Sequence, residues 1–455
     1  KHYWLMDAFN ENSNEQQAQQ PMGCLHRFSK TIKVVIIGLL ILLLMIPMFM
    51  IENLISERGR TQEEAIDEVS EKWSLAQTIT GPYLNLQYPV VTENNGEKKV
   101  SIKDLILFPD ELMVNGQLKT EILKRSIYEV NVYQSELTLK GSFSSEELKK
   151  SRIDMDQLQF DRAAICLNLT DMRGISEQIS ITLGDSVYIF EPGMDNRGIA
   201  NTGVHAIANL SELKQNKKLP YEIKIKLKGS QSLNFIPLGK TTRVDLKANW
   251  NTPSFTGNYL PNNRNITEKE FSAQWQVLNL NRNYSQVMAD YNTSNIKDIE
   301  NSSFGVNFKI PVEQYQQSMR SAKYAILIIL LTFGVIFFTE IMNKTRIHAL
   351  QYLLVGLALC LFYSLLLSFS EHIGFNPAYL LSSALTIILV GGYMFGITKK
   401  KKPSLIMSGL LGILYLYIFV LIQLETFALL AGSLGLFIIL AMVMYFSKKI
   451  DWFNE

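Results

Sequence analysis

Residues 31–51 read TIKVVIIGLLILLLMIPMFMI, an apolar run whose one charged residue, Lys33, lies close to its start. An α-helix needs about 20 apolar residues to cross the roughly 30 Å hydrocarbon core of a bilayer. No small-residue cleavage site follows the run, so we interpret it as an uncleaved transmembrane helix and not as a signal peptide. This segment alone predicts an integral membrane protein.

The chain returns to apolar sequence near its end. Residues 322–342, 349–369 and 375–397 each have the length of a transmembrane helix, and residues 403–447 have room for two. We place a turn near Gln423–Glu425 and expect helices at 403–422 and 426–447. The sequence thus predicts about six transmembrane helices, five of them in a bundle at 322–447.

Basic residues predict the orientation, because Lys and Arg gather in cytoplasmic loops. With six crossings, all four basic clusters fall on one side of the membrane: Arg27, Lys30 and Lys33; Lys344 and Arg346; Lys399–Lys402; Lys448 and Lys449. We therefore expect a disordered cytoplasmic N-terminus at 1–30, a cytoplasmic tail at 448–455 and an extracytoplasmic domain between the first two helices. The chain does not begin with Met, and we leave open whether translation starts at Met6 or Met22.

The region between the first helix and the bundle changes its periodicity. Residues 52–80 show helical spacing and predict an amphipathic helix that leaves the membrane and ends at Gly81-Pro82. Residues 81–321 then alternate apolar and polar, as in Tyr221–Lys228, with turn signals such as Asn115-Gly116. We predict an all-β, antiparallel, sandwich-like extracytoplasmic domain.

Composition and motifs exclude several classes of function. A net charge of +2 gives no field that would attract nucleic acid, and three scattered cysteines form neither a zinc site nor a disulfide within the large domain. We find no metal-binding, Walker or Rossmann motif. Only His205 and His372 are expected outside the cytoplasm, and no Gly-x-Ser-x-Gly is present. We therefore expect no catalytic, metal or cofactor-binding residues.

Two groups of polar residues flank the predicted bundle. At the outer rim we expect Arg320, Lys323, Glu371 and His372. Our hypothesis is that their opposite charges couple the β-domain to the bundle; the alternative is that each anchors its own helix end. At the inner rim lie Glu340, Arg346, His348 and Gln351. These residues suit either contact with lipid headgroups or docking of a cytoplasmic partner.

Several motifs resemble the CreD family of bacterial inner-membrane proteins. In the bundle they are Gln314-Tyr315-Gln316, Ala322–Leu327, Arg346, His348, Gln351–Leu357, Phe362-Tyr363 and Ser370–Phe375. In the large domain they are Gly81-Pro82, Ile127–Val130, Pro253–Phe255, Gly257, Leu260-Pro261, Phe271, Ala273 and Trp275. The resemblance implies an inner-membrane protein linked to envelope integrity and to envelope-stress or β-lactam responses. It implies no mechanism.

We interpret the chain as a non-enzymatic membrane protein that supports envelope integrity and the envelope-stress response. The expected partners are the lipid bilayer and an envelope protein, lipid or peptidoglycan ligand bound by the β-domain; a homo-oligomer stays open. One alternative is a transporter or channel, for which Ser364, Ser368, Ser382, Ser383 and Thr386 are the candidate polar residues. Another is an enzyme that acts on lipid or peptidoglycan precursors.

Overall fold

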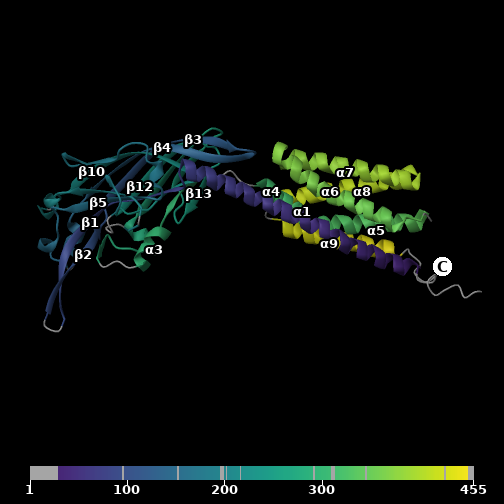
Figure 1. The fold of residues 1–455 in the computed structure, drawn as a ribbon, viewed down its shortest axis with the longest axis horizontal. Coiled ribbons are helices and arrows are strands. Elements are labelled where there is room, and N and C mark those ends of the chain that lie inside the picture. Colours follow the sequence, from purple (N-terminus) through teal and green to yellow (C-terminus); the bar gives the residue numbers. More distant parts are fainter. Residues whose placement is uncertain are drawn as a thin grey trace, which may run out of the picture. The chain divides into compact units, whose positions relative to one another are not determined.

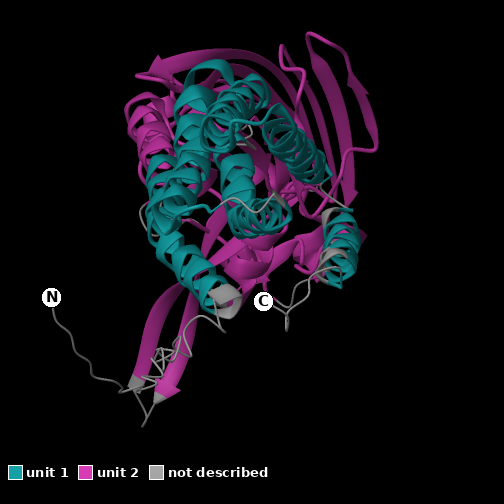
Figure 2. Cartoon of the chain, turned by 90° about the vertical axis from the view of Figure 1, so that its right-hand side faces the viewer, with its two compact units in different colours: residues 1–59, 312–455 teal, residues 60–311 magenta. Residues whose placement is uncertain are grey.

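The computed structural model describes residues 29–94, 97–150, 153–194, 199–200, 202–215, 217–289, 293–308, 313–343, 346–424 and 427–448. The chain forms two compact units, unit 1 with residues 1–59 and 312–455 and unit 2 with residues 60–311 (Figure 2). One continuous helix, α1 (Ser29–Trp73), contributes its first part to unit 1 and its second part to unit 2. The predicted N-terminal disorder and most of the predicted tail lie outside the described residues.

Unit 1 is helical. It contains α4 (Glu313–Lys323), α5 (Ala325–Asn343), α6 (Ala349–Ile373), α7 (Phe375–Thr398), α8 (Lys401–Gln423) and α9 (Ala428–Ser447) in addition to α1 (Figure 1). In the described part of the chain, α1, α5, α6, α7 and α8 are long and apolar enough to cross a membrane, and α9 is a further apolar helix. The prediction of an N-terminal apolar helix and a C-terminal helical bundle is confirmed.

Helix α4 was not foreseen as a separate element. We expected residues up to 321 to belong to the β-domain, but α4 is part of unit 1 and ends just before α5. Tyr315, Ser318 and Ala322 are buried, and Arg320 and Lys323 are exposed. This spacing of three to four residues is that of a helix with one buried face.

Unit 2 is built from two β-sheets. One sheet has the order β13 (Ser254–Gly257), β17 (Phe304–Asn307), β11 (Ser232–Phe235), β1 (Gln77–Asn94), β5 (Ala163–Leu169), β9 (Val204–Ala208) and β8 (Glu191–Pro192), with β2 (Glu97–Leu107) beside β1 and β16 (Val287–Ala289) beside β2. The other has the order β14 (Asn263–Ile266), β15 (Phe271–Leu278), β12 (Thr241–Ala248), β3 (Glu111–Arg125), β4 (Tyr128–Phe143), β10 (Leu219–Ser230), β6 (Ser180–Leu183) and β7 (Ser186–Ile189). Hereafter we call unit 2 the β-domain.

The main core of the β-domain combines inward-facing residues of both sheets. Leu84 and Leu86 of β1 belong to the same buried cluster as Leu139 of β4 and Ile223 of β10. Burial alternates along β3 and β10, as the period of two in their sequences predicts. The prediction of a large β-rich domain with sandwich-like layers is confirmed.

The β-domain departs from a purely antiparallel, all-β arrangement in two ways. Strand β1 pairs with β11 in parallel, and β3 pairs with β12 in parallel. Short helices also join the strands: α2 (Glu146–Lys150), α3 (Thr293–Asn301) and the 3₁₀ turns Met155–Gln157, Met172–Gly174, Ser211–Gln215 and Asn279–Asn281. The two parallel pairs join strands that are far apart in the sequence, so no local sequence pattern predicts this pairing.

The predicted end of the amphipathic helix was wrong. Helix α1 ends at Trp73, and Gly81-Pro82 lies inside strand β1, at the irregularity where its register with β5 shifts. The helix ends early because Leu75 N–H donates to the Asp171 carboxylate at 2.9 Å instead of to a helix carbonyl.

The predicted turn at Asn115-Gly116 was also wrong, since both residues lie within strand β3. A Cβ atom at Gly116 would lie 2.6 Å from Leu246 Cδ2 and 2.7 Å from Leu137 Cδ2. The glycine therefore serves close packing between neighbouring strands.

The nine-stranded sheet is covered on its second face as well. Tyr83 of β1 and Cys166 of β5 point away from the main core and pack with Ile199 and with Ile299 of α3. Asn168 of β5 and Thr170, which follows the strand, lie on this same face, because residues two apart share a face. The covered apolar surface thus passes into a polar one at the end of β5.

Candidate functional site: two polar clusters on helix α1 and a hollow in the β-domain

Glu340 near the end of α5 is the centre of the first polar cluster, which we call the Glu340 cluster. Its Oε1 accepts hydrogen bonds from the Lys33 ammonium of α1 and from Ile347 N–H at 3.2 Å. Its Oε2 accepts one from the Tyr352 hydroxyl of α6 at 3.1 Å. The Lys33 ammonium also donates to the Ile347 carbonyl at 3.0 Å. Three donors therefore satisfy a carboxylate whose residue is only 9 % exposed.

The other predicted inner-rim residues have separate roles. His348 precedes α6, and its Nδ1 accepts a hydrogen bond from Leu350 N–H at 3.2 Å. The Gln351 side chain accepts one from His348 N–H at 3.0 Å, which completes a capping box. Arg346 is exposed. The structure thus joins His348 to Gln351, and it joins Glu340 to Lys33, Ile347 and Tyr352, which lie outside the predicted inner-rim group.

Glu371 near the end of α6 is the centre of the second polar cluster, the Glu371 cluster. The Tyr315 hydroxyl of α4 donates to Glu371 Oε1 at 3.0 Å, and Arg58 Nε of α1 lies 3.8 Å from the same oxygen. Arg320, Lys323 and His372 are exposed. Among the described residues, no ion pair joins Lys323 to Glu371. The role of the outer-rim residues in coupling stays a prediction.

Between these clusters, α1 packs closely against unit 1. Leu40, Leu44, Met48 and Ile55 form its buried stripe, at the spacing of one helix face. A Cβ atom at Gly356 of α6 would collide with the Leu44 side chain. Helix α1 is therefore held in unit 1 by apolar packing in its middle and by Lys33 and Arg58 on either side.

The second part of α1 is held within the β-domain through Asp171. The Asp171 carboxylate accepts hydrogen bonds from Leu75 N–H at 2.9 Å and from Arg173 Nε at 2.9 Å. Gln77 Nε2 donates to the Asp171 carbonyl at 2.8 Å, and the Lys228 ammonium lies 4.9 Å from the centre of the Trp73 ring. Burial acts to raise the pKa of Asp171, but the hydrogen bonds from Arg173 and Leu75 outweigh it and leave this pKa below its ordinary value.

A polar hollow of about 310 Å³ opens on the second face of the nine-stranded sheet. We call it the threonine hollow. Its polar lining consists of Thr78 and Thr80 of β1, Asn168 and Thr170 on and after β5, Thr202, Glu300 of α3 and Ser303. No local sequence pattern predicts this hollow, because its lining, which also includes Ile236, comes from five separate segments.

The floor of the threonine hollow is firmly held. Asn168 Oδ1 accepts a hydrogen bond from the Tyr83 hydroxyl at 2.7 Å, and its Nδ2 donates to the carbonyls of Ala200 at 3.1 Å and Thr202 at 2.8 Å. Within the described part of the chain, the side chains of Thr80, Thr202, Glu300 and Ser303 make no hydrogen bond of their own. Their donors and acceptors are available to a ligand.

His205, Ser383 and Thr386 serve the fold. His205 Nδ1 lies 2.7 Å from the Gly193 carbonyl, which suits the structural role of a buried histidine. Ser383 and Thr386 of α7 are buried and donate to carbonyls of their own helix. In the residues that the structure describes, no three His, Cys, Asp or Glu side chains gather to hold a metal ion.

Comparison with known proteins places the chain among bacterial membrane proteins. The family model described as inner membrane protein CreD matches residues 29–453. The inner membrane protein CreD of Escherichia coli K12 is 32 % identical over 420 residues, which cover 91 % of each chain. The match extends over α1, both sheets and the helical bundle. This chain belongs to the CreD family of inner membrane proteins.

Proposed function

We propose that this inner-membrane protein is a non-enzymatic binding protein whose β-domain lies in the periplasm and holds an envelope component, through which it supports envelope integrity and the envelope-stress response. The observation that carries the proposal is the threonine hollow, a preformed polar recess in the β-domain. Its volume is at the lower end of the range of about 300–1,000 Å³ that is typical of small-molecule sites.

The chemistry of the hollow suits peptidoglycan. Hydroxyl groups such as those of Thr80, Thr202 and Ser303 both donate and accept hydrogen bonds, which matches the hydroxyls of a sugar chain. Glu300 is the one charged residue of the lining, and it would attract a free amine of a peptide stem. We therefore propose a peptidoglycan segment as the ligand.

The periplasmic placement rests on the basic residues of the membrane unit. Lys33, Arg346 and the run Lys399–Lys402 fall on one side of the membrane when α1 and α5 to α8 each cross it. The β-domain follows α1 on the opposite side. With α9 as a sixth crossing, both chain ends are cytoplasmic.

The binding proposal can be tested by filling the hollow. Thr202→Trp places a large ring among the free hydroxyls, and Thr182→Trp is the matched control because Thr182 is exposed on β6 of the other sheet. We expect the full-length protein to co-sediment with purified peptidoglycan, the Thr202→Trp variant to lose this binding and the Thr182→Trp variant to keep it. Equal binding by both variants would exclude the hollow as the site.

The placement can be tested with a cysteine in the turn between β6 and β7. In a Cys24→Ser background, the exposed Asp185→Cys is the thiol open to labelling, because the native Cys166 and Cys360 are buried. A membrane-impermeant maleimide should label Asp185→Cys in cells whose outer membrane is permeabilised and whose inner membrane is intact. It should label Lys400→Cys only after lysis. The reverse pattern would place the β-domain in the cytoplasm.

A further inference from the structure

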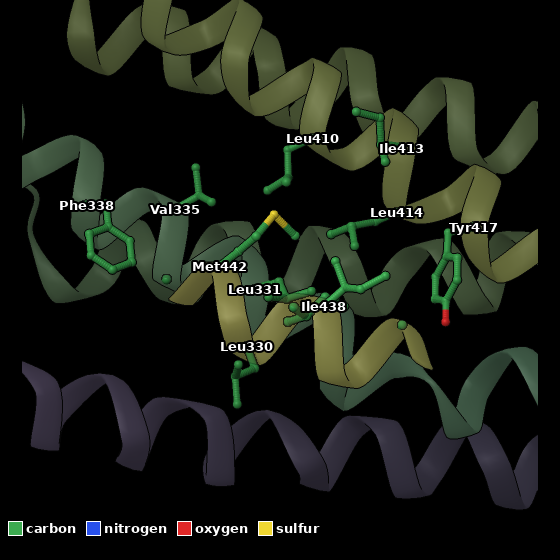
Figure 3. Close-up of a pocket in the computed structure, with 13 residues that line it drawn as sticks. Leu330, Leu331, Val335, Phe338, Leu410, Ile413, Leu414, Tyr417, Ile438 and Met442 are labelled. Atoms are coloured by element: carbon green, nitrogen blue, oxygen red, sulfur yellow. The ribbon is translucent and has the colours of Figure 1, made fainter. Parts of the chain in front are cut away.

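An apolar cavity of about 380 Å³ lies among α5, α8 and α9 of the membrane unit (Figure 3). Leu330 comes from α5, Ile413 and Tyr417 come from α8, and Ile438 and Met442 come from α9. Apart from the Tyr417 hydroxyl, the lining side chains are aliphatic or aromatic. The size is that of a ligand site and not of a packing defect.

Two glycines shape this cavity in opposite ways. At Gly435 of α9, a Cβ atom would collide with the Tyr417 hydroxyl, so the tyrosine packs directly on the backbone of α9. The same hydroxyl donates to the Ala431 carbonyl at 2.7 Å, which joins α8 to α9 beside the cavity. At Gly334 of α5, a Cβ atom would meet nothing within 4 Å. The missing side chain of Gly334 therefore leaves space that no neighbour fills.

The lining defines the chemistry of an occupant. The Tyr417 hydroxyl already has its acceptor in Ala431, so the described lining offers a ligand no unused hydrogen-bond donor. An apolar cavity of this kind also stays dry, because a buried water needs polar partners. The occupant must be a hydrocarbon without polar groups at this depth.

The rim of the cavity is open. Leu330 is 48 % exposed, Ile413 67 % and Met442 50 %. Helices α5 and α8 are long and apolar enough to cross a membrane, so the medium at this rim is the hydrocarbon of the bilayer. A neighbouring helix, about 10 Å wide with its side chains, would lie across the rim, whereas a hydrocarbon chain can enter.

We propose that α5, α8 and α9 form a binding site for one acyl chain of a membrane phospholipid, which packs against Gly334. Association within a bilayer depends on close packing, and a slot between helices offers an acyl chain more contact than a convex helix face. The site is separate from the threonine hollow, and its existence does not depend on peptidoglycan binding.

The test uses the full-length protein in lipid nanodiscs that contain a small fraction of phosphatidylethanolamine with a diazirine in one acyl chain. After irradiation, the labelled residues are mapped by mass spectrometry. We expect adducts concentrated on the cavity residues Leu330, Ile413 and Met442, with a yield that saturates as the fraction of probe rises. Labelling spread evenly over all membrane-facing helices, in simple proportion to the probe, would overturn the proposal.

Two matched variants sharpen the test. Gly334→Leu fills the cavity, and Gly392→Leu on α7 adds the same side chain at an exposed glycine that also has open space around it. We expect loss of the cavity adducts in Gly334→Leu and retention in Gly392→Leu. Gly334→Ala should reduce the yield to an intermediate level without disturbing the helix, since Ala favours helices over Gly.

Competition with unlabelled lipids identifies which lipid supplies the bound hydrocarbon chain. Unlabelled phosphatidylethanolamine should lower the adduct yield at the cavity. If a polyprenyl phosphate competes and the phospholipid does not, the occupant is an isoprenoid carrier and the proposal is wrong. Protein–protein adducts from a diazirine amino acid at Ile413 would instead show that a second copy covers the cavity.

Discussion

Lys33 and Glu340 form an ion pair although 307 residues separate them in the chain. The pair links α1, the helix that continues into the β-domain, to the end of α5 and, through Tyr352, to α6. The Glu340 residue is only 9 % exposed, and a buried carboxylate is costly unless it is paired, so the pair is expected to matter for the stability of unit 1. The Glu340 cluster is accordingly the first target for mutation.

Removing one partner of this pair should destabilise unit 1. Glu340→Ala leaves the Lys33 ammonium without its carboxylate, and we expect a loss of about 1–3 kcal/mol, because Lys33 is partly exposed and a fully buried pair would cost more. The double variant Lys33→Met with Glu340→Leu should recover part of the loss. Thermal unfolding in detergent measures the effect. Lys72→Met, which breaks the exposed pair with Glu68, is the control and should lower the unfolding temperature far less than Glu340→Ala does.

Glu371 should couple energetically to Arg58 and Tyr315. A double-mutant cycle on Arg58 and Glu371 should give a coupling energy of about 0.5–1 kcal/mol, since Arg58 is half exposed and lies 3.8 Å away. A cycle on Tyr315 and Glu371 should give a similar value. A cycle on Lys323 and Glu371 should be additive within about 0.5 kcal/mol. Coupling to Lys323 instead of Arg58 would contradict the geometry of the Glu371 cluster.

His348 should act through the start of α6. His348→Ala removes the acceptor for Leu350 N–H and should cost about 0.5–2 kcal/mol in thermal unfolding. His348→Asn keeps an N-cap acceptor and should restore most of this stability. Arg346→Ala should have little effect, because Arg346 is exposed. If Asn fails to rescue the loss, capping is not the role of His348, and its predicted contact with lipid or a partner becomes the better explanation.

The stability contributed by Asp171 should disappear at low pH. The pKa of this carboxyl is lowered in the folded protein, so its stabilising effect is complete above the unfolded value of about 3.9 and is lost as the pH falls through the lower folded value. Asp171→Asn should therefore weaken the β-domain at pH 7 and should converge with the wild type only when the pH falls below the folded pKa of Asp171. Hydrogen exchange in strand β5 reports this difference. Asp161→Asn, at an exposed turn, is the control.

Gly116 should tolerate no side chain. A Cβ atom there would press on Leu137 and Leu246, so we expect Gly116→Ala to cost about 1–3 kcal/mol through overpacking. Asn115→Ala, at the exposed neighbouring position of β3, should change stability much less. If Gly116→Ala proved neutral when measured by hydrogen exchange of β3, the strand would have room that the structure does not show.

The sequence by itself determined the class of protein and most of its elements. Residues 31–51 and the apolar runs at 322–447 predict membrane helices, because only an uninterrupted apolar segment is stable in hydrocarbon. The alternation in Tyr221–Lys228 predicts strand β10, because side chains of a strand point alternately to its two faces. These signals are local, and each can be read within one segment.

The tertiary structure decided which of these elements meet. It paired Glu340 with Lys33 and Glu371 with Arg58, placed Gly116 inside a strand and ended α1 at Trp73 beside Asp171. It also assembled the threonine hollow from five segments and the apolar cavity among α5, α8 and α9 from three helices. Such contacts depend on how distant segments pack, and a hydrogen bond between residues hundreds of positions apart leaves no mark in the sequence around either one.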